Sequence, residues 1–171
     1  VIPSDMNLAA ADIELSSKEK RETLLKDSLA PLKDKFDYII LDCPPSLSLI
    51  TINALSSADS VVVPMQCEYF ALEGLSQLIF TLKQVKRMYN PSLNLLGIIL
   101  TMFDGRLNLS IQVMEEIRKH FPDKIFSHAI PRAVRLSEAP SHSKPILYYD
   151  KYSKGALAYM EVAKELIKRT T

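Results

Sequence analysis

Residues 36–46 read FDYIILDCPPS and place a single carboxylate, Asp42, directly after an apolar run. Residues 38–41 are continuously apolar and too short for a helix, which is typical of a strand buried on both faces of a parallel sheet. Ligands of open α/β sheets bind outside the carboxyl ends of the strands, where an Asp suits a hydrated magnesium ion beside phosphates. The pattern predicts a strand that ends at a magnesium-binding carboxylate, with an ordinary strand end as the alternative.

Two prolines follow this carboxylate almost at once. Pro44 and Pro45 fix φ and remove two backbone donors, so a helix cannot begin before Ser46. We therefore expect the strand to leave the sheet through a stiff turn.

The elements that must position these residues alternate between strand and helix along the chain. Capping residues and apolar periodicity predict six helices. The first begins at Ser4 or Asp5 and ends at 15, the second begins with a capping box of Ser16 and Glu19 and ends at 33, and the third begins at Ser46 or Ser48 and ends at 57. The others are expected over 71–89, 110–121 and 153–169. The expected strands are a strand end at 1–3, then 38–41, 60–64, 95–102, 125–130 and 146–149. Such alternation predicts an α/β fold, a doubly wound and mostly parallel sheet with helices on both faces. No repeat or low-complexity linker interrupts it, so we expect residues 1–171 to form a single domain.

Composition excludes several classes of protein. At 171 residues, with 47% hydrophobic and 24% charged residues, the chain can bury one sizeable core. No apolar run is long enough to cross a bilayer, which favours a cytoplasmic protein. Net charge is +1, so any affinity for nucleic acid must come from local patches. Cys43 and Cys67 lack C-x-x-C spacing, and we expect both to be reduced packing residues.

Three longer segments carry a family resemblance: LDCPPSLSLITINALSSADSVVVPMQCEYFALEGL, GIILTMFDGR and IPRAVRLSEAPSHSKPI. Together they resemble the ParA/Soj partition ATPases, in register over about residues 1–168. The resemblance implies a deviant Walker A P-loop ATPase with ATP and Mg²⁺ as cofactors. It further implies a homodimer that sandwiches ATP, non-specific DNA binding on the nucleoid, and hydrolysis stimulated by a ParB-type partner.

The resemblance assigns roles around the first motif. Asp42 takes the position of a Walker B carboxylate, close to Mg²⁺ through water. Pro44, Pro45 and Ser46 match the second switch, the loop that senses the γ-phosphate. Asp37 precedes the strand and is expected to be a solvated acid instead.

Other matched positions border the nucleotide. The resemblance places Gln66 and Glu68 near the dimer interface. The alternative for Glu68 is an exposed acid near a helix start, where the helix dipole favours negative charge. The resemblance places two strand edges around the adenine, and plain strand-to-loop transitions are the alternative. These edges comprise Thr101, Met102, Pro131 and Arg132.

Two loop cations match DNA-contacting arginines of the family. Arg106 and Arg135 each follow an expected strand and could reach phosphates, and a dimer would double the set. For the helical cations nearby, a solvated face is the better reading.

One family feature is missing from the sequence. A P-loop needs a glycine-rich turn closed by Lys and by Ser or Thr. The four glycines, Gly74, Gly97, Gly105 and Gly155, are far apart and none is followed by Lys. We expect the chain to be the C-terminal two-thirds of a longer ATPase domain, truncated before its P-loop and inactive alone.

Two alternatives stay open. A MinD-like membrane-associated division ATPase would end in a basic amphipathic anchor. The last expected helix instead carries Leu157, Met160, Ala163, Leu166 and Ile167 on one face and charges of both signs elsewhere, which favours core packing without a membrane partner. A non-catalytic interaction module is the other alternative, and nucleotide binding by the intact gene product would discriminate against it.

Overall fold

The computed structural model describes residues 3–171, and the chain divides into two compact units. Unit 1 comprises the described residues up to Val61 together with Gln77–Asn94. Unit 2 comprises Val62–Ser76 together with Leu95–Thr171. The strand end expected at residues 1–3 falls mainly on residues 1 and 2, which lie outside the described range.

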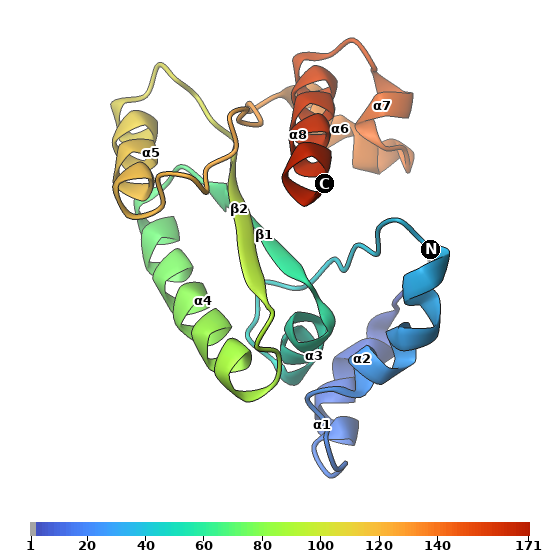
Figure 1. Ribbon diagram of the computed structural model, residues 1–171. Helices are drawn as coiled ribbons and strands as arrows, with labels where there is room; N and C mark the ends of the chain where they lie inside the picture. Colours follow the sequence, from blue (N-terminus) through green and yellow to red (C-terminus); the bar gives the residue numbers. More distant parts are fainter. Residues whose placement is uncertain (1–2) are drawn as a thin grey trace. The chain divides into compact units, whose positions relative to one another are not determined.

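Unit 1 consists mainly of short helices (Figure 1). In chain order they are η1 (Met6–Ala10), α1 (Ala11–Leu15), α2 (Leu24–Leu29), η2 (Ala30–Lys35) and α3 (Leu49–Ser57), followed by the part of α4 (Tyr69–Met88) after Ser76. The Asp5 side chain caps the first of these by accepting the N–H of Asn7 at 2.8 Å, as its sequence position suggested. The expected capping box at Ser16 is wrong. Ser16 ends α1, and residues 16–23 form turns before α2 begins.

A buried amide connects α2 with α3. Asn53 donates to the carbonyl of Arg21 at 2.6 Å and accepts the N–H of Leu25 at 3.1 Å. The latter bond satisfies one of the helix-start donors of α2, which have no partner within the helix. Ser48 is the N-cap of α3, so the helix expected to begin at Ser46 or Ser48 and to end at Ser57 is confirmed, with Ser48 as its start.

The strand predicted over 38–41 is wrong. Residues 36–48 contain no helix or strand, and the side chains of Tyr38 and Ile40 are 45% and 85% exposed. An apolar segment becomes a strand only where a neighbouring strand pairs with its backbone groups. No other described segment forms a ladder with this one. The segment lies in unit 1 and belongs to no sheet of the described chain.

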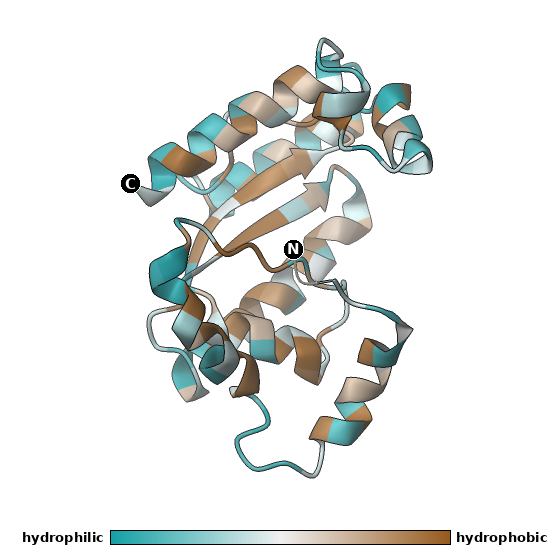
Figure 2. Ribbon diagram, turned by 90° about the vertical axis from the view of Figure 1, so that its right-hand side faces the viewer, coloured by the Kyte–Doolittle hydropathy of each residue, from teal (hydrophilic) through white to brown (hydrophobic). Residues whose placement is uncertain are grey.

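The sheet is formed by β1 (Ser60–Gln66) and β2 (Asn94–Thr101), which are hydrogen-bonded neighbours. Nearly all of both strands belongs to unit 2, and their connection through α4 is the long crossover that parallel strands require. Figure 2 shows that both strands are mostly hydrophobic, as expected for a sheet covered on both faces.

Residues 124–131 extend this sheet through two isolated parallel bridges. Ile98 pairs with Ile125, and Phe103 pairs with Pro131. The first side spans five residue steps between the bridges and the second spans six, so the second carries one extra residue. The pairing between the two segments is therefore not a continuous ladder. The strand expected over 125–130 is therefore present only as two bridges.

Helices lie on both sides of the sheet in unit 2, with α5 (Asn108–His120) on one side and α8 (Lys154–Thr170) on the other (Figure 1). The fold-class prediction of a parallel α/β sheet is confirmed. A core of Phe126, Ile130 and Val162 packs against Val62 and Ile99. The remaining elements are α6 (Val134–Glu138), η3 (Ala139–His142) and α7 (Ile146–Tyr149).

Two sequence predictions near the end of the chain need correction. The expected strand over 146–149 is the helical turn α7, which follows Pro145 and pairs with no strand of the described chain. The expected apolar face of α8 is partly exposed, because Leu157 and Ile167 are 54% and 51% accessible. The buried residues of α8 are Gly155, Ala156 and Val162. Within residues 3–171 no helix has the length and apolar content that crossing a membrane would need.

Candidate functional site

A cleft of about 520 Å³ opens in unit 2 where β1 and β2 end. It is lined by the end of β1, the start of α4, the turn after β2 and the residue after Pro131. Four residues singled out from the sequence lie together here, namely Gln66, Glu68, Met102 and Arg132. Thr101 and Pro131 directly precede the last two. The carboxyl edge of a parallel sheet is where ligands of such folds bind.

The backbone turns sharply at the end of β2. Met102 has φ of 50°, in the left-handed region that costs a non-glycine residue about 1–2 kcal/mol. The next residue, Phe103, donates its N–H to the carbonyl of Ile130 at 3.0 Å, which fixes the turn against the neighbouring segment. The turn carries Asp104 into the lining of the cleft.

Asp104 holds the predicted DNA-contact residue Arg106. Its carboxylate accepts bonds from Nε at 2.9 Å, from Nη2 at 2.7 Å and from the backbone N–H of Arg106 at 3.0 Å. These hydrogen bonds, together with the charges of Arg106 and Arg132, lower the pKa of Asp104 to about 2. Asp104 is therefore ionised at neutral pH, and its pair with Arg106 carries no net charge.

The other predicted DNA-contact residue, Arg135, is also paired. Its Nη1 lies 2.9 Å from Glu138 and its Nε lies 3.5 Å from Asp150. Glu138 also accepts the hydroxyl proton of Tyr149 at 3.1 Å, and the Arg135 guanidinium lies 5.9 Å from the centre of that ring. The hydrogen bond to Glu138 is the largest cause that keeps the pKa of Arg135 above its ordinary value.

Asp42 and its neighbours lie in unit 1. Asp42, Pro44, Pro45 and Ser46 are all exposed in the irregular segment, and the carbonyl of Ser46 accepts the Thr51 hydroxyl at 2.6 Å. The motif is accessible to a ligand although its strand does not form. Neighbouring atoms partly desolvate the Cys43 sulfur although the residue is exposed, and this desolvation, with a smaller contribution from the charge of Asp42, raises the pKa of the thiol.

The expectation that both cysteines pack inside the protein is confirmed for one of them. Cys67 is buried, whereas Cys43 is exposed.

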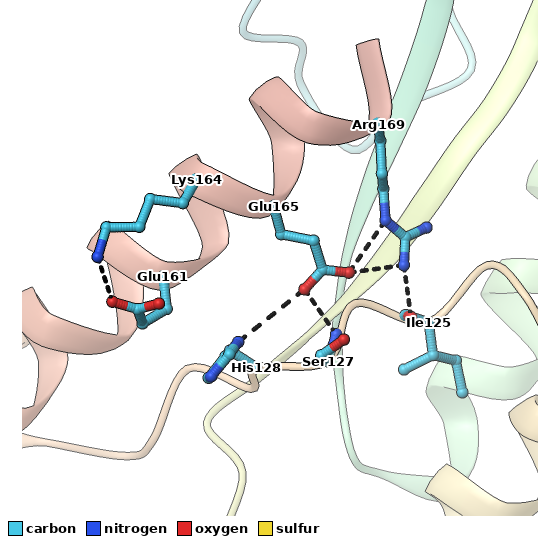
Figure 3. A network of polar contacts seen from close by, with 7 residues as sticks. All are labelled: Ile125, Ser127, His128, Glu161, Lys164, Glu165 and Arg169. Carbon is cyan, nitrogen blue, oxygen red and sulfur yellow. Dashed lines mark hydrogen bonds and ion pairs between the residues drawn. The ribbon is translucent and has the colours of Figure 1, made fainter. Parts of the chain in front are cut away.

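A polar network that sequence reasoning missed fixes α8 to the edge of the sheet (Figure 3). The Glu165 carboxylate accepts the Ser127 N–H at 2.9 Å and both Nε and Nη2 of Arg169, at 3.0 and 2.7 Å. Arg169 also donates to the carbonyls of Leu96 and Ile125, at 3.2 and 2.8 Å. The spacing of Glu165 and Arg169, four residues apart on a helix, was the available signal.

Comparison with protein families gives a match over the first half of the chain. A family described as AAA domain matches residues 1–95. The sporulation initiation inhibitor protein Soj of Bacillus subtilis is 56% identical over 166 residues, which are 97% of this chain and 66% of that protein. The chromosome partitioning protein ParA of Myxococcus xanthus is 53% identical over 171 residues, which are 100% of this chain and 60% of that protein.

Solved structures of similar proteins superpose on most of this chain. Cobyrinic acid a,c-diamide synthase from Mycobacterium smegmatis, with bound ATP analogue and magnesium, superposes with a TM-score of 0.84 at 36% identity, over 99% of this chain and 62% of that one. A plasmid partition protein from Borrelia burgdorferi gives a TM-score of 0.67 at 27% identity, over 95% of this chain and 61% of that one.

The sheet, its flanking helices and these matches define the class as a ParA-like fold of the P-loop NTPases. Within that class, the chain belongs to the ParA/Soj family of partitioning proteins. It spans less than two-thirds of the length of the two curated relatives named above. The family assignment made from the sequence segments is confirmed.

Proposed function

We propose that the chain is the C-terminal part of a single-domain partition ATPase whose nucleotide state controls binding to DNA. The observation that carries this proposal is the cleft at the ends of β1 and β2, which gathers Gln66, Glu68, Met102 and Arg132 in one place. The rival reading, a non-catalytic interaction module, gives no reason for these four residues to line one cleft.

The proposed cofactors are ATP and Mg²⁺. We propose that Thr101, Met102, Pro131 and Arg132 border the adenine. Met102 and Arg132 line the cleft, and the other two residues directly precede them in the sequence, which supports this proposal. Asp42 is an exposed carboxylate that would hold Mg²⁺ through water. The ion, when bound, would neutralise charge on the phosphates. The M. smegmatis structure with ATP analogue and magnesium supports this cofactor pair.

This sequence contains no glycine-rich loop that could bind the phosphates of ATP. Of the glycines, Gly74 lies in α4, Gly97 in β2 and Gly155 in α8, and Gly105 is followed by Arg106. We therefore propose that the 171-residue chain binds ATP weakly and does not hydrolyse it, because backbone N–H donors and lysines dominate phosphate binding in P-loops.

The remaining parts of the proposal concern assembly and DNA. Gln66 and Glu68 are exposed at the cleft and would meet a second subunit when ATP binds. Arg106 and Arg135 would contact DNA phosphates without reading sequence. A ParB-type partner would stimulate hydrolysis and release the dimer from the nucleoid, in the cytoplasm. The name of the M. xanthus relative, chromosome partitioning protein ParA, supports the partitioning role.

The test compares two carboxylates of one segment in the intact gene product. Asp42→Ala should lower Mg²⁺-dependent ATP turnover about tenfold or more, as loss of a water-mediated metal partner does elsewhere. Asp37→Ala removes an exposed acid five residues earlier and should leave turnover unchanged. Equal turnover in the two variants would remove Asp42 from the proposed metal site.

A further inference from the structure

Both arginines of the proposed DNA surface are already bound to carboxylates of their own chain. Arg106 is held by Asp104 and Arg135 by Glu138, with shortest distances of 2.7 and 2.9 Å. All four residues belong to unit 2. A DNA phosphate that approaches either arginine therefore meets a cation that is already paired with at least one carboxylate.

The Asp104–Arg106 pair uses part of the guanidinium only. Nε and Nη2 face the carboxylate, whereas no hydrogen bond from Nη1 is formed within the described chain. The Arg106 side chain is 89% exposed, so a phosphate can reach it. Since Asp104 stays ionised far below neutral pH, its charge opposes the phosphate under all physiological conditions.

The Arg135 pair is built differently, because two carboxylates share one guanidinium. Glu138 lies 2.9 Å from Nη1, Asp150 lies 3.5 Å from Nε, and the Tyr149 hydroxyl orients Glu138. Removing Glu138 alone leaves Asp150 in place. The two arginines thus differ in how many carboxylates must be neutralised to unmask them.

We propose that Asp104 and the pair Glu138 and Asp150 limit the affinity of the protein for DNA by neutralising Arg106 and Arg135. This inference rests on the proposed function, in which these arginines contact phosphates. Counterion release requires a cation that can neutralise a phosphate, and a cation already paired with a carboxylate contributes less to it. This competition keeps the binding of DNA weak enough for release.

The experiment measures DNA affinity of the intact gene product at several salt concentrations. The probe is a short duplex of random sequence, with a non-hydrolysable ATP analogue at saturation. Asp104→Asn should tighten binding about two- to fivefold, the range expected when an exposed ion pair no longer competes. It should also steepen the salt dependence, by at most about one phosphate equivalent.

The second arginine supplies an internal comparison. Glu138→Gln alone should change affinity less than twofold, and Glu138→Gln with Asp150→Asn should reach the effect of Asp104→Asn. Glu161→Gln is the matched control, because it removes one negative charge from an exposed pair, with Lys164 at 2.7 Å, outside the proposed surface. Tightening by the control equal to that of Asp104→Asn would overturn the inference.

Two further measurements separate the possible failures. Asp104 lines the cleft, so nucleotide affinity is measured with a fluorescent ATP analogue, and the Glu138 and Asp150 variants decide the matter if Asp104→Asn loses nucleotide. Arg106→Ala tests the proposed function itself and should weaken binding. If Arg106→Ala weakens binding while no carboxylate variant tightens it, the inference is wrong and the DNA role stands. If Arg106→Ala and Arg135→Ala together change nothing, the DNA role falls.

Discussion

Replacing Arg169 by Ala should destabilise unit 2 far more than its place as the third-last residue of the sequence suggests. Arg169 donates to Glu165 and to carbonyls of residues 96, 123 and 125, and its guanidinium lies 4.4 Å from the Phe126 ring centre. The side chains of Arg169 and Glu165 are only 21% and 15% exposed. Truncation therefore leaves a mostly buried carboxylate without its arginine partner.

The expected magnitude follows from that burial. Exposed ion pairs contribute about 0–1 kcal/mol, and breaking a fully buried pair costs about 3–5 kcal/mol. The Arg169 network lies between these limits, so we expect a loss of about 2–4 kcal/mol. With a urea dependence of about 2 kcal/mol/M, the unfolding midpoint should fall by about 1–2 M.

Urea unfolding of the 171-residue chain, followed by circular dichroism, measures this loss. Arg169→Lys keeps the charge but not the planar fork, so its loss should be intermediate. Lys164→Ala breaks the exposed pair with Glu161 and should cost less than about 0.5 kcal/mol. A midpoint for Arg169→Ala no lower than that of Lys164→Ala would refute the argument.

Two further predictions concern packing and acid stability. A Cβ at Gly155 would lie 2.5–2.8 Å from the Leu136 side chain, so Gly155→Ala should destabilise the protein by about 1–3 kcal/mol. A Cβ at Gly74 would have nothing within 4 Å, so Gly74→Ala should stabilise α4 by about 0.5–1 kcal/mol. Urea unfolding of both variants measures these changes. Because the pKa of Asp104 is lowered from 3.8 to about 2, its contribution to stability is present above pH 4 and is lost as the pH falls through 2. Unfolding of Asp104→Asn should therefore depend less on pH between 4 and 2, and an unchanged pH dependence would contradict this.

The sequence predicted those elements whose signals are local. Ser48 and Ser153 mark helix starts that the structure confirms, and the apolar runs around Val62 and Ile98 are strands. The predictions failed where pairing decides the outcome. Residues 38–41 have the composition of a strand but no ladder partner among the described residues, and residues 146–149 turn helical after Pro145. A single sequence carries no information about which segment will pair with which.

The candidate site likewise contains some residues that the sequence identified and others that it did not. Motif matching found Met102, Arg132, Gln66 and Glu68, which the fold brings into one cleft. It did not identify Asp104 or Glu138 as partners of the arginines, although each lies two or three residues from its arginine in sequence. Short spacing predicts that two residues lie close together on a helix or turn. The turn that brings Asp104 to Arg106 follows a left-handed backbone at Met102, however, and a methionine does not predict a left-handed conformation as a glycine would.

Helix α8 has a length that matches the sheet it covers. Its 17 residues extend about 25 Å, and the eight residues of β2 extend about 26 Å. One end is fixed where Gly155 meets Leu136, and the other where Arg169 reaches the carbonyl of Leu96. Inserting a single residue between these ends would turn Arg169 by about 100° around the helix axis, away from its partners. The helix thus tolerates substitutions on its outer face but no change of length, and in this region insertions should be tolerated only in the loops.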